Sequence, residues 1–233
     1  EDPKRVPALI LANEQGLAAA LEAAVDKIAV FTAASETFNQ RNIRASILES
    51  LERFKPVVAK AKQSRLPVRA YVSTAFFCPF EGRIAPEKVM AVVDRLDVLG
   101  VDELSIGDTI GRAAPADVRR LLDSLLKRVK TERVFLHFHD TYGMAVANAL
   151  TAWEQYGICG FDASAGGLGG CPYAPGASGN VATEDLIFAL RSSGAKVSVD
   201  VEKVRSAALV FQGSLGRALP SHLSRIAMVS KTL

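Results

Sequence analysis

Short apolar runs alternate with longer amphipathic stretches along this chain. The short runs are rich in β-branched and aromatic residues and almost free of polar positions, a pattern typical of strands buried on both faces of a parallel sheet. They predict strands at 6–11, 27–32, 68–73, 103–108, 134–139 and 159–164. Helical periodicity predicts helices at 15–24, 43–63, 86–99, 115–129, 143–156 and 183–193, with further helices beyond.

The sixfold alternation of strand and helix predicts a parallel sheet with helical crossovers. Two architectures have this alternation, an open doubly wound sheet and a (β/α)₈ TIM barrel. An open sheet usually has a GxGxxG turn after its first strand, and "LANEQGLAAA" is not such a turn. We therefore expect one α/β barrel domain over 1–233, with the first one or two β/α units missing from this sequence.

Composition excludes several classes of protein. The chain has 233 residues, 49% of them hydrophobic and 23% charged, with a net charge of +3, as expected for a globular protein with a large core. The basic clusters fall on helix faces, so no nucleic-acid partner is predicted. No apolar run reaches the roughly 18 residues of a membrane span. Three cysteines without a CxxC predict a reducing compartment rather than a disulfide framework.

Two of the three histidines lie at the carboxyl end of one predicted strand, "VFLHFH". Residues i and i+2 of a strand point to the same face, so His137 and His139 project side by side, about 6.6 Å apart. Both could reach one metal ion with bonds of about 2.1 Å. The alternative is a pair of core histidines held by hydrogen bonds, and the strand pattern leaves both interpretations open.

Polar residues also follow other predicted strands. They come in pairs, Ser73–Thr74, Asp108–Thr109 and Asp162 with Ser164. A buried carboxylate without a partner is costly, so polar groups gathered at one rim indicate a solvated functional site. Each of them alone is equally compatible with a turn or helix cap.

A glycine-rich segment, "AGGLGGCPYAPGASGN", spans 165–180 and contains six glycines and two prolines. Such loops permit unusual backbone angles and close approach of the backbone to a ligand. A thiol here, Cys171, could donate a proton or act as a nucleophile, the alternative being an inert buried thiol. Asn180 could complete a metal site through its amide oxygen or cap the following helix, and the two roles are compatible.

Together, "SIGDTIG", "HFHDTYG" and "GGLGGCPYAPGASGN" resemble the 3-hydroxy-3-methylglutaryl-CoA (HMG-CoA) lyase family. "AASETFNQRNI", "VSTAFFCPFEG" and "SGNVATEDL" fit as well, and the resemblance extends from about Val6 to about residue 193. It implies a (β/α)₈ barrel that cleaves an HMG thioester into acetyl-CoA and acetoacetate.

The resemblance also implies roles for individual residues. His137, His139 and Asn180 match the family's metal ligands, for Mg²⁺ or Mn²⁺, and Asp108, Cys171 and His137 match catalytic positions. An acyl-CoA substrate, a homodimer and a cytoplasmic location are implied too, with the mitochondrial matrix as the alternative compartment.

Two other functions stay open. One is a lyase for a longer branched hydroxyglutaryl-CoA, since one methylene changes pocket affinity by only about 1–3 kcal/mol. The other is an incomplete barrel that binds without catalysis. The second is motivated by the family's first-strand segment, which carries an arginine and a metal-binding aspartate and has no counterpart in this sequence.

Overall fold

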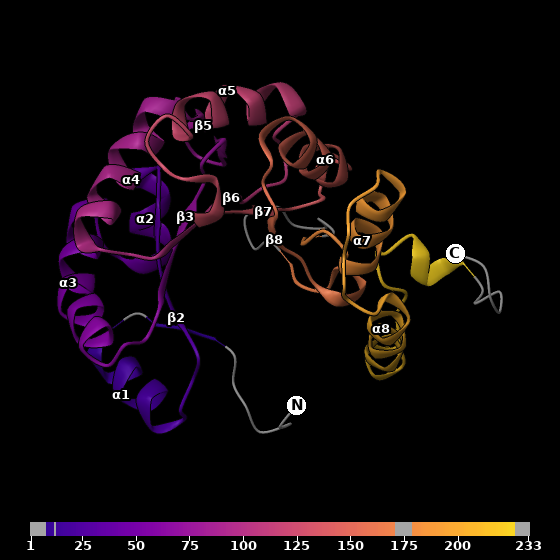
Figure 1. Cartoon of the computed structure of the whole chain (residues 1–233), viewed down its shortest axis with the longest axis horizontal. Helices are drawn as coiled ribbons and strands as arrows, with labels where there is room; N and C mark the ends of the chain where they lie inside the picture. The colour runs from indigo at the N-terminus through magenta and orange to yellow at the C-terminus, as the bar shows by residue number, and fades with distance from the viewer. Residues whose placement is uncertain (1–7, 12, 171–178, 227–233) are drawn as a thin grey trace.

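The computed structural model of the protein describes residues 8–11, 13–170 and 179–226. Six parallel strands form one sheet in which each strand pairs with the one before it, in the order β1-β2-β3-β6-β7-β8 (Figure 1). Their bounds are β1 (Leu9–Ile10), β2 (Ile28–Ala33), β3 (Val68–Ser73), β6 (Glu103–Asp108), β7 (Val134–Phe138) and β8 (Gly160–Asp162). The order never reverses, which excludes the doubly wound alternative, since that fold has a switch point in its strand order.

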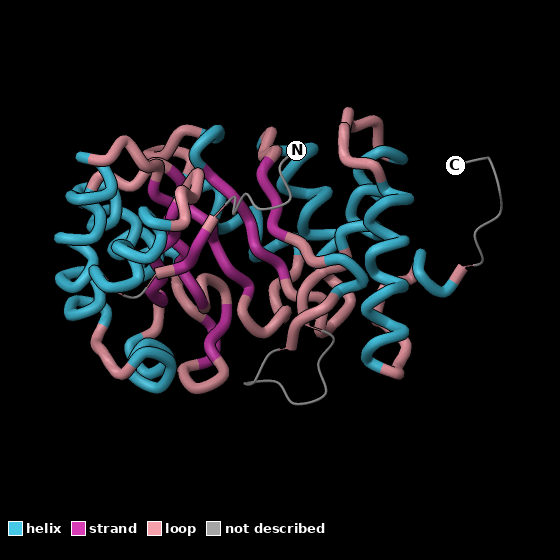
Figure 2. Tube along the Cα trace, turned by 90° about the horizontal axis from the view of Figure 1, so that it is seen from below, coloured by secondary structure: helices cyan, strands magenta, loops and turns pink. Residues whose placement is uncertain are grey.

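The helices lie along the outer, convex side of this curled sheet (Figures 1 and 2). They are α1 (Glu14–Glu22), α2 (Glu36–Ile43), α3 (Ile47–Gln63), α4 (Pro86–Leu99), α5 (Pro115–Leu125), α6 (Ala145–Tyr156), α7 (Thr183–Ser192) and α8 (Val201–Leu215). Three 3₁₀ turns are η1 (Thr131–Arg133), η2 (Ala165–Gly167) and η3 (Leu223–Arg225). A curled parallel sheet with helices around it is part of a (β/α) barrel, as the sequence predicts.

Helix starts follow from local chemistry. The side chain of Asn13 accepts a hydrogen bond from the backbone of Gly16, and Ser35 caps α2 in the same way. Ser46 and Glu49 form a reciprocal capping box at the start of α3. Such caps satisfy backbone N–H groups that have no partner within the helix, which fixes where each helix begins.

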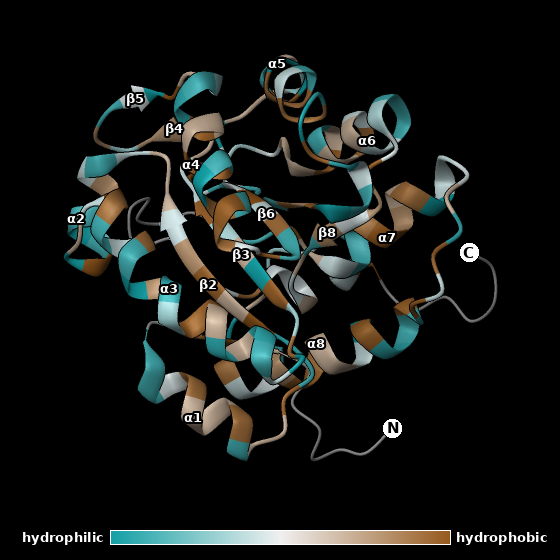
Figure 3. Ribbon diagram, turned by 60° about the vertical axis from the view of Figure 1, so that its left-hand side comes forward, coloured by the Kyte–Doolittle hydropathy of each residue, from teal (hydrophilic) through white to brown (hydrophobic). Residues whose placement is uncertain are grey.

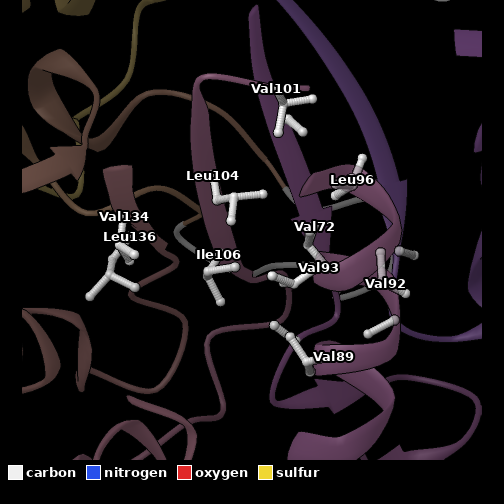
Figure 4. Packing of buried hydrophobic residues seen from close by; sticks show 14 of the residues in the cluster. Val72, Val89, Val92, Val93, Leu96, Val101, Leu104, Ile106, Val134 and Leu136 are labelled. Carbon is white, nitrogen blue, oxygen red and sulfur yellow. The ribbon is translucent and has the colours of Figure 1, made fainter. Parts of the chain in front are cut away.

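The hydrophobic core fills the space between the sheet and the helices. The helices that pack on the central strands, such as α3 and α4, bury apolar side chains toward the sheet and carry polar positions elsewhere (Figure 3). The close view shows α4 packing on the sheet through fully or nearly fully buried side chains: Val72, Val89, Val92, Val93, Leu96, Leu104 and Ile106 (Figure 4). Burying one such side chain stabilises the fold by about 1.5–3 kcal/mol. The helix-facing side chains of the central strands therefore contribute to stability, and the opposite face is left for the site.

Two features differ from the prediction. The interval before α3 contains a separate helix, α2, which ends where Arg44 adopts a left-handed conformation with φ of 50°. A small antiparallel hairpin, β4 (Phe77–Cys78) with β5 (Gly82–Arg83), follows β3. Within the described ranges, no helix is long and apolar enough to cross a membrane.

Candidate active site

A cavity of about 700 Å³ lies on the inner face of the curled sheet. Its polar lining comes from four neighbouring strands or the residues just after them, and includes Tyr71, Ser105, Thr109, His137, His139 and Asp162. In parallel barrels, catalytic groups gather at the carboxyl ends of strands. The cavity is therefore the candidate active site.

Strand β7 and the residue that follows it place His137 and His139 in the wall of this cavity. Its alternate residues Val134, Leu136 and Phe138 are buried against the helices, so His137 and His139 project to the other face. Their ring centroids are 5.2 Å apart. The side-by-side placement expected from the i, i+2 spacing is what the structure shows.

His139 is held in its neutral form. Burial, with the neighbouring His137 as a second cause, lowers the pKa of His139 from 6.5 to about 4. Nδ1 of His137 and Nδ1 of His139 are both buried without a hydrogen-bond partner among the described residues. Both rings line the cavity rather than the packed layer between sheet and helices, which favours a ligand role over the core pair of the alternative interpretation.

These features fit a divalent cation. A metal ligand must be a neutral imidazole, and rings 5.2 Å apart can both approach one ion with bonds of about 2.1 Å. In the described part of the chain, no three His, Cys, Asp or Glu side chains gather as a metal site. A cation held by the two histidines would take further oxygen ligands, for which the amide of Asn180 is a candidate.

Asn180 lies next to His139 through the backbone. The two residues form an isolated antiparallel bridge, and Asp140 donates its backbone N–H to the carbonyl of Gly179, at 2.7 Å. The amide nitrogen of Asn180 donates to the carbonyl of Leu168 at 2.9 Å, so its oxygen is not used by this contact. The helix-cap role considered for Asn180 is wrong, because the residue at the N-cap of α7 is Ala182.

Asp108 lies elsewhere. It pairs in register with Phe138, so it shares the helix-facing side of the sheet and is fully buried. Its carboxylate accepts backbone N–H groups of Arg112 and Ala113, at 3.1 and 2.9 Å. Burial outweighs these bonds and raises the pKa of Asp108 to about 6. Among the residues that the structure describes, Asp108 is not part of the cavity lining.

The predicted catalytic thiol, Cys171, falls in 171–178 and lies outside the described residues. The flanking glycines have positive φ, 115° at Gly169 and 81° at Gly179. A Cβ on Gly179 would lie 1.9 Å from the carbonyl oxygen of Gly169. Only glycine allows the two residues to approach in this way, so Gly169 and Gly179 lie in contact beside Asn180.

Sequence reasoning singled out Asp162 but missed three charged side chains that pair with it or with one another, Lys27, Arg69 and Glu103. We call Lys27, Arg69, Glu103 and Asp162 the inner-face ion network. Arg69 donates to Glu103 at 2.7 Å and to Asp162 at 2.9 Å, and Lys27 pairs with Glu103 at 2.5 Å. Alternation along β3 and β6 gave a signal, since Arg69 and Glu103 interrupt apolar strands on the face that also carries the site.

Comparisons with known proteins agree with this geometry. The family model HMGL-like matches residues 1–210. Hydroxymethylglutaryl-CoA lyase YngG of Bacillus subtilis is 48% identical over 214 residues, which are 92% of this chain and 71% of that protein.

Two solved structures are similar as well. The HMG-CoA lyase of Bacillus subtilis superposes with a TM-score of 0.91 at 47% identity, over 94% of this chain and 73% of that one. An HMG-CoA lyase of Acinetobacter baumannii, in complex with coenzyme A and 3-methylmalate, gives a TM-score of 0.89 at 33% identity, over 97% and 73%.

Proposed function

Because this chain belongs to the HMGL-like family, we propose that it cleaves HMG-CoA into acetyl-CoA and acetoacetate. The family match, and the 48% identity to a lyase of that name over most of the chain, support this substrate. The observation that carries the proposal is the His137–His139 pair, with rings 5.2 Å apart at the mouth of a cavity that can admit a ligand.

We assign His137, His139 and the amide oxygen of Asn180 as ligands of Mg²⁺ or Mn²⁺. Burial keeps His139 neutral, and the hydrogen bond from Asn180 to Leu168 fixes its amide plane. Imidazole and oxygen ligands suit these ions better than a closed thiolate site does. Such a cation would bind the substrate's tertiary hydroxyl and carboxylate and make the hydroxyl more acidic.

The chain's own residues supply the rest of the chemistry. As the hydroxyl proton passes to solvent, the hydroxyl oxygen becomes the ketone of acetoacetate, the carbon–carbon bond breaks, and its electron pair passes to the acetyl thioester as an enolate. We assign the thiol of Cys171 as the donor of the proton that converts this enolate to acetyl-CoA. This assignment is supported by the sequence position of Cys171, two residues after Gly169, which contacts Gly179 beside Asn180. Asp108 serves the site indirectly, by holding the turn at Arg112 and Ala113.

The coenzyme A thioester is the proposed form of the substrate, since a similar lyase is solved with coenzyme A bound. A longer branched hydroxyglutaryl-CoA stays the alternative, because an apolar extension changes affinity too little to be excluded by sequence. A homodimer and a cytoplasmic location remain predictions, for light scattering and for fractionation respectively.

The test is a direct assay of the purified chain with Mg²⁺ or Mn²⁺. We expect equal amounts of acetyl-CoA and acetoacetate from HMG-CoA, and loss of both products when His139 is replaced by Ala. A preference for the longer substrate would favour the alternative lyase. No release of acetyl-CoA from either thioester, by folded and metal-loaded protein, would leave the non-catalytic barrel as the function.

A further inference from the structure

The carboxylate of Asp162, at the end of β8, faces the imidazole of His137. Asp162 Oδ2 lies 3.6 Å from His137 Nδ1, with the two side chains 20% and 29% exposed. Strand register explains the approach, since Asp162 and His137 are direct partners across β7 and β8. In the described part of the chain, Nδ1 has no hydrogen-bond partner, and this carboxylate is the acceptor placed to serve it.

Asp162 is itself fixed in place. Ser105 donates its hydroxyl to Oδ2 at 2.7 Å, and Arg69 donates to Oδ1 at 2.9 Å. The Arg69 guanidinium is fixed in turn, because it bonds Glu103 and lies 3.7 Å from the centre of the Phe135 ring. The carboxylate therefore cannot turn away from His137 without losing two hydrogen bonds.

The inner-face ion network is balanced in charge. Its two cations, Lys27 and Arg69, face its two carboxylates, Glu103 and Asp162. A balanced, hydrogen-bonded set is the form in which buried charges are stable. This charge balance and the hydrogen bonds from Ser105 and Arg69 favour the ionised form of Asp162, which can only accept hydrogen bonds.

The ring of His137 is confined on its other sides. Tyr71 contacts it edge-on, with centroids 6.3 Å apart and an interplanar angle of 85°, and the ring of His139 lies 5.2 Å away. With Nδ1 turned toward Asp162, the other ring nitrogen, Nε2, is left for a ligand. Histidines that bind metals generally donate their second N–H to a carboxylate or carbonyl.

We propose that Asp162 is a positioning residue that holds His137 in the Nδ1–H tautomer and so keeps Nε2 free to bind a divalent cation. This inference rests on the metal role of His137 in the proposed function. Asp162 itself contacts neither cation nor substrate in this scheme. Ser105 and Arg69 act one step further out, by fixing the carboxylate.

The decisive variant is Asp162→Asn. Arg69 and Ser105 then hold the amide with its oxygen toward the guanidinium, which leaves its NH₂ group facing His137. An NH₂ group can only donate, so Nδ1 becomes the acceptor and the proton moves to Nε2. Long-range ¹H–¹⁵N NMR of the metal-free full chain reports this tautomer. We expect Nδ1–H in the wild type and Nε2–H in the variant.

Metal affinity is the second readout. Titration with Mn²⁺, followed by electron paramagnetic resonance, should show 10- to 100-fold weaker binding by Asp162→Asn, which is about the usual effect of removing such a partner. Glu103→Gln is the matched control, since it removes a carboxylate from the same network without facing His137. It should change Mn²⁺ affinity by less than about threefold and leave the tautomer as it is.

Each outcome separates this inference from the proposed function. An Nε2–H tautomer in the wild type would overturn the inference even if Asp162→Asn failed to fold. Equal losses of Mn²⁺ affinity in Asp162→Asn and Glu103→Gln would show that Asp162 has only a structural role. Normal Mn²⁺ binding and the expected tautomer change, without any acetyl-CoA release, would instead overturn only the lyase assignment.

Discussion

Asp108 and His137 lie on neighbouring strands but on opposite faces of the sheet. The partner of His137 across β6 and β7 is Gly107, while Asp108 pairs with Phe138. A carboxylate that the sequence places among catalytic residues is thus directed toward the helices, where it accepts backbone hydrogen bonds. The protonation state of Asp108 should therefore affect mainly the free energy of unfolding.

We predict that stability depends on pH through Asp108. Its carboxyl group titrates near 3.8 in the unfolded chain but at about 6 in the folded protein, so the folded state binds more protons between these values. The contribution of Asp108 to the free energy of unfolding is complete below about pH 4. It is lost as the pH rises through about 6, which lowers the free energy of unfolding by roughly 3 kcal/mol. Urea unfolding of wild type and Asp108→Asn across this range measures it. A constant difference between the two proteins would contradict the assignment.

Gly111 is predicted to couple the turn after β6 to the proposed metal site. Its φ is 70°, and a Cβ there would lie 2.8 Å from the carbonyl oxygen of His139. Gly111→Ala should cost about 2–4 kcal/mol, from the left-handed backbone and the overlap together, and should weaken Mn²⁺ binding. Gly143→Ala is the matched control, because it has the same φ and nothing within 4 Å. It should cost about 1 kcal/mol and leave Mn²⁺ affinity unchanged.

His139→Ala should abolish metal binding while the protein stays folded. The variant removes a ligand that burial keeps neutral, so the Mn²⁺ affinity should fall by more than about 100-fold, beyond the effect expected for an outer partner. Isothermal titration calorimetry gives the affinity, and circular dichroism checks the fold. Retention of wild-type affinity would remove His139 from the ligand set.

Cys171→Ala should lower kcat by about 10²–10⁴-fold, the usual contribution of a general acid, with little change in Mn²⁺ affinity. Cys159 provides a control, since it is exposed and its thiol contacts only the carbonyl of Gly157 within the described structure. Cys159→Ala should keep full turnover. If both variants turned over at the wild-type rate, the proton donor would have to be another group.

Much of the fold could be predicted from periodicity. The strand predicted at 68–73 begins and ends where β3 does, and 103–108 coincides with β6. β6 is buried along nearly its whole length, and the residues of β3 alternate between buried and partly buried, so both strands stand out as apolar runs. The helix at 36–43 was missed because its mean composition is polar and a break at Arg44 separates it from α3 by only a few residues.

The site was predicted only in part. The alternation of side chains along one strand shows which residues share a face, but it does not show how neighbouring strands are aligned. The spacing of His137 and His139 fixes their common face without any tertiary information. Whether Asp108 or Gly107 lies beside them depends on how β6 aligns with β7, and that alignment follows from packing across the whole sheet. Asp162 shows the same limit, since its approach to His137 exists only once β7 and β8 are paired.

The strand order has a consequence for how the chain acquires its structure. Since each strand of the sheet pairs with its predecessor, every newly synthesised β/α unit finds its docking edge already in place. Assembly can then proceed from the N-terminal strands onward, one β/α unit at a time, with each strand docking on the edge of the one before it. The ionic contact between Arg69 and Asp162, 93 positions apart, is among the late events of that sequence. The approach of Asp162 to His137 therefore cannot form before β8 has been synthesised.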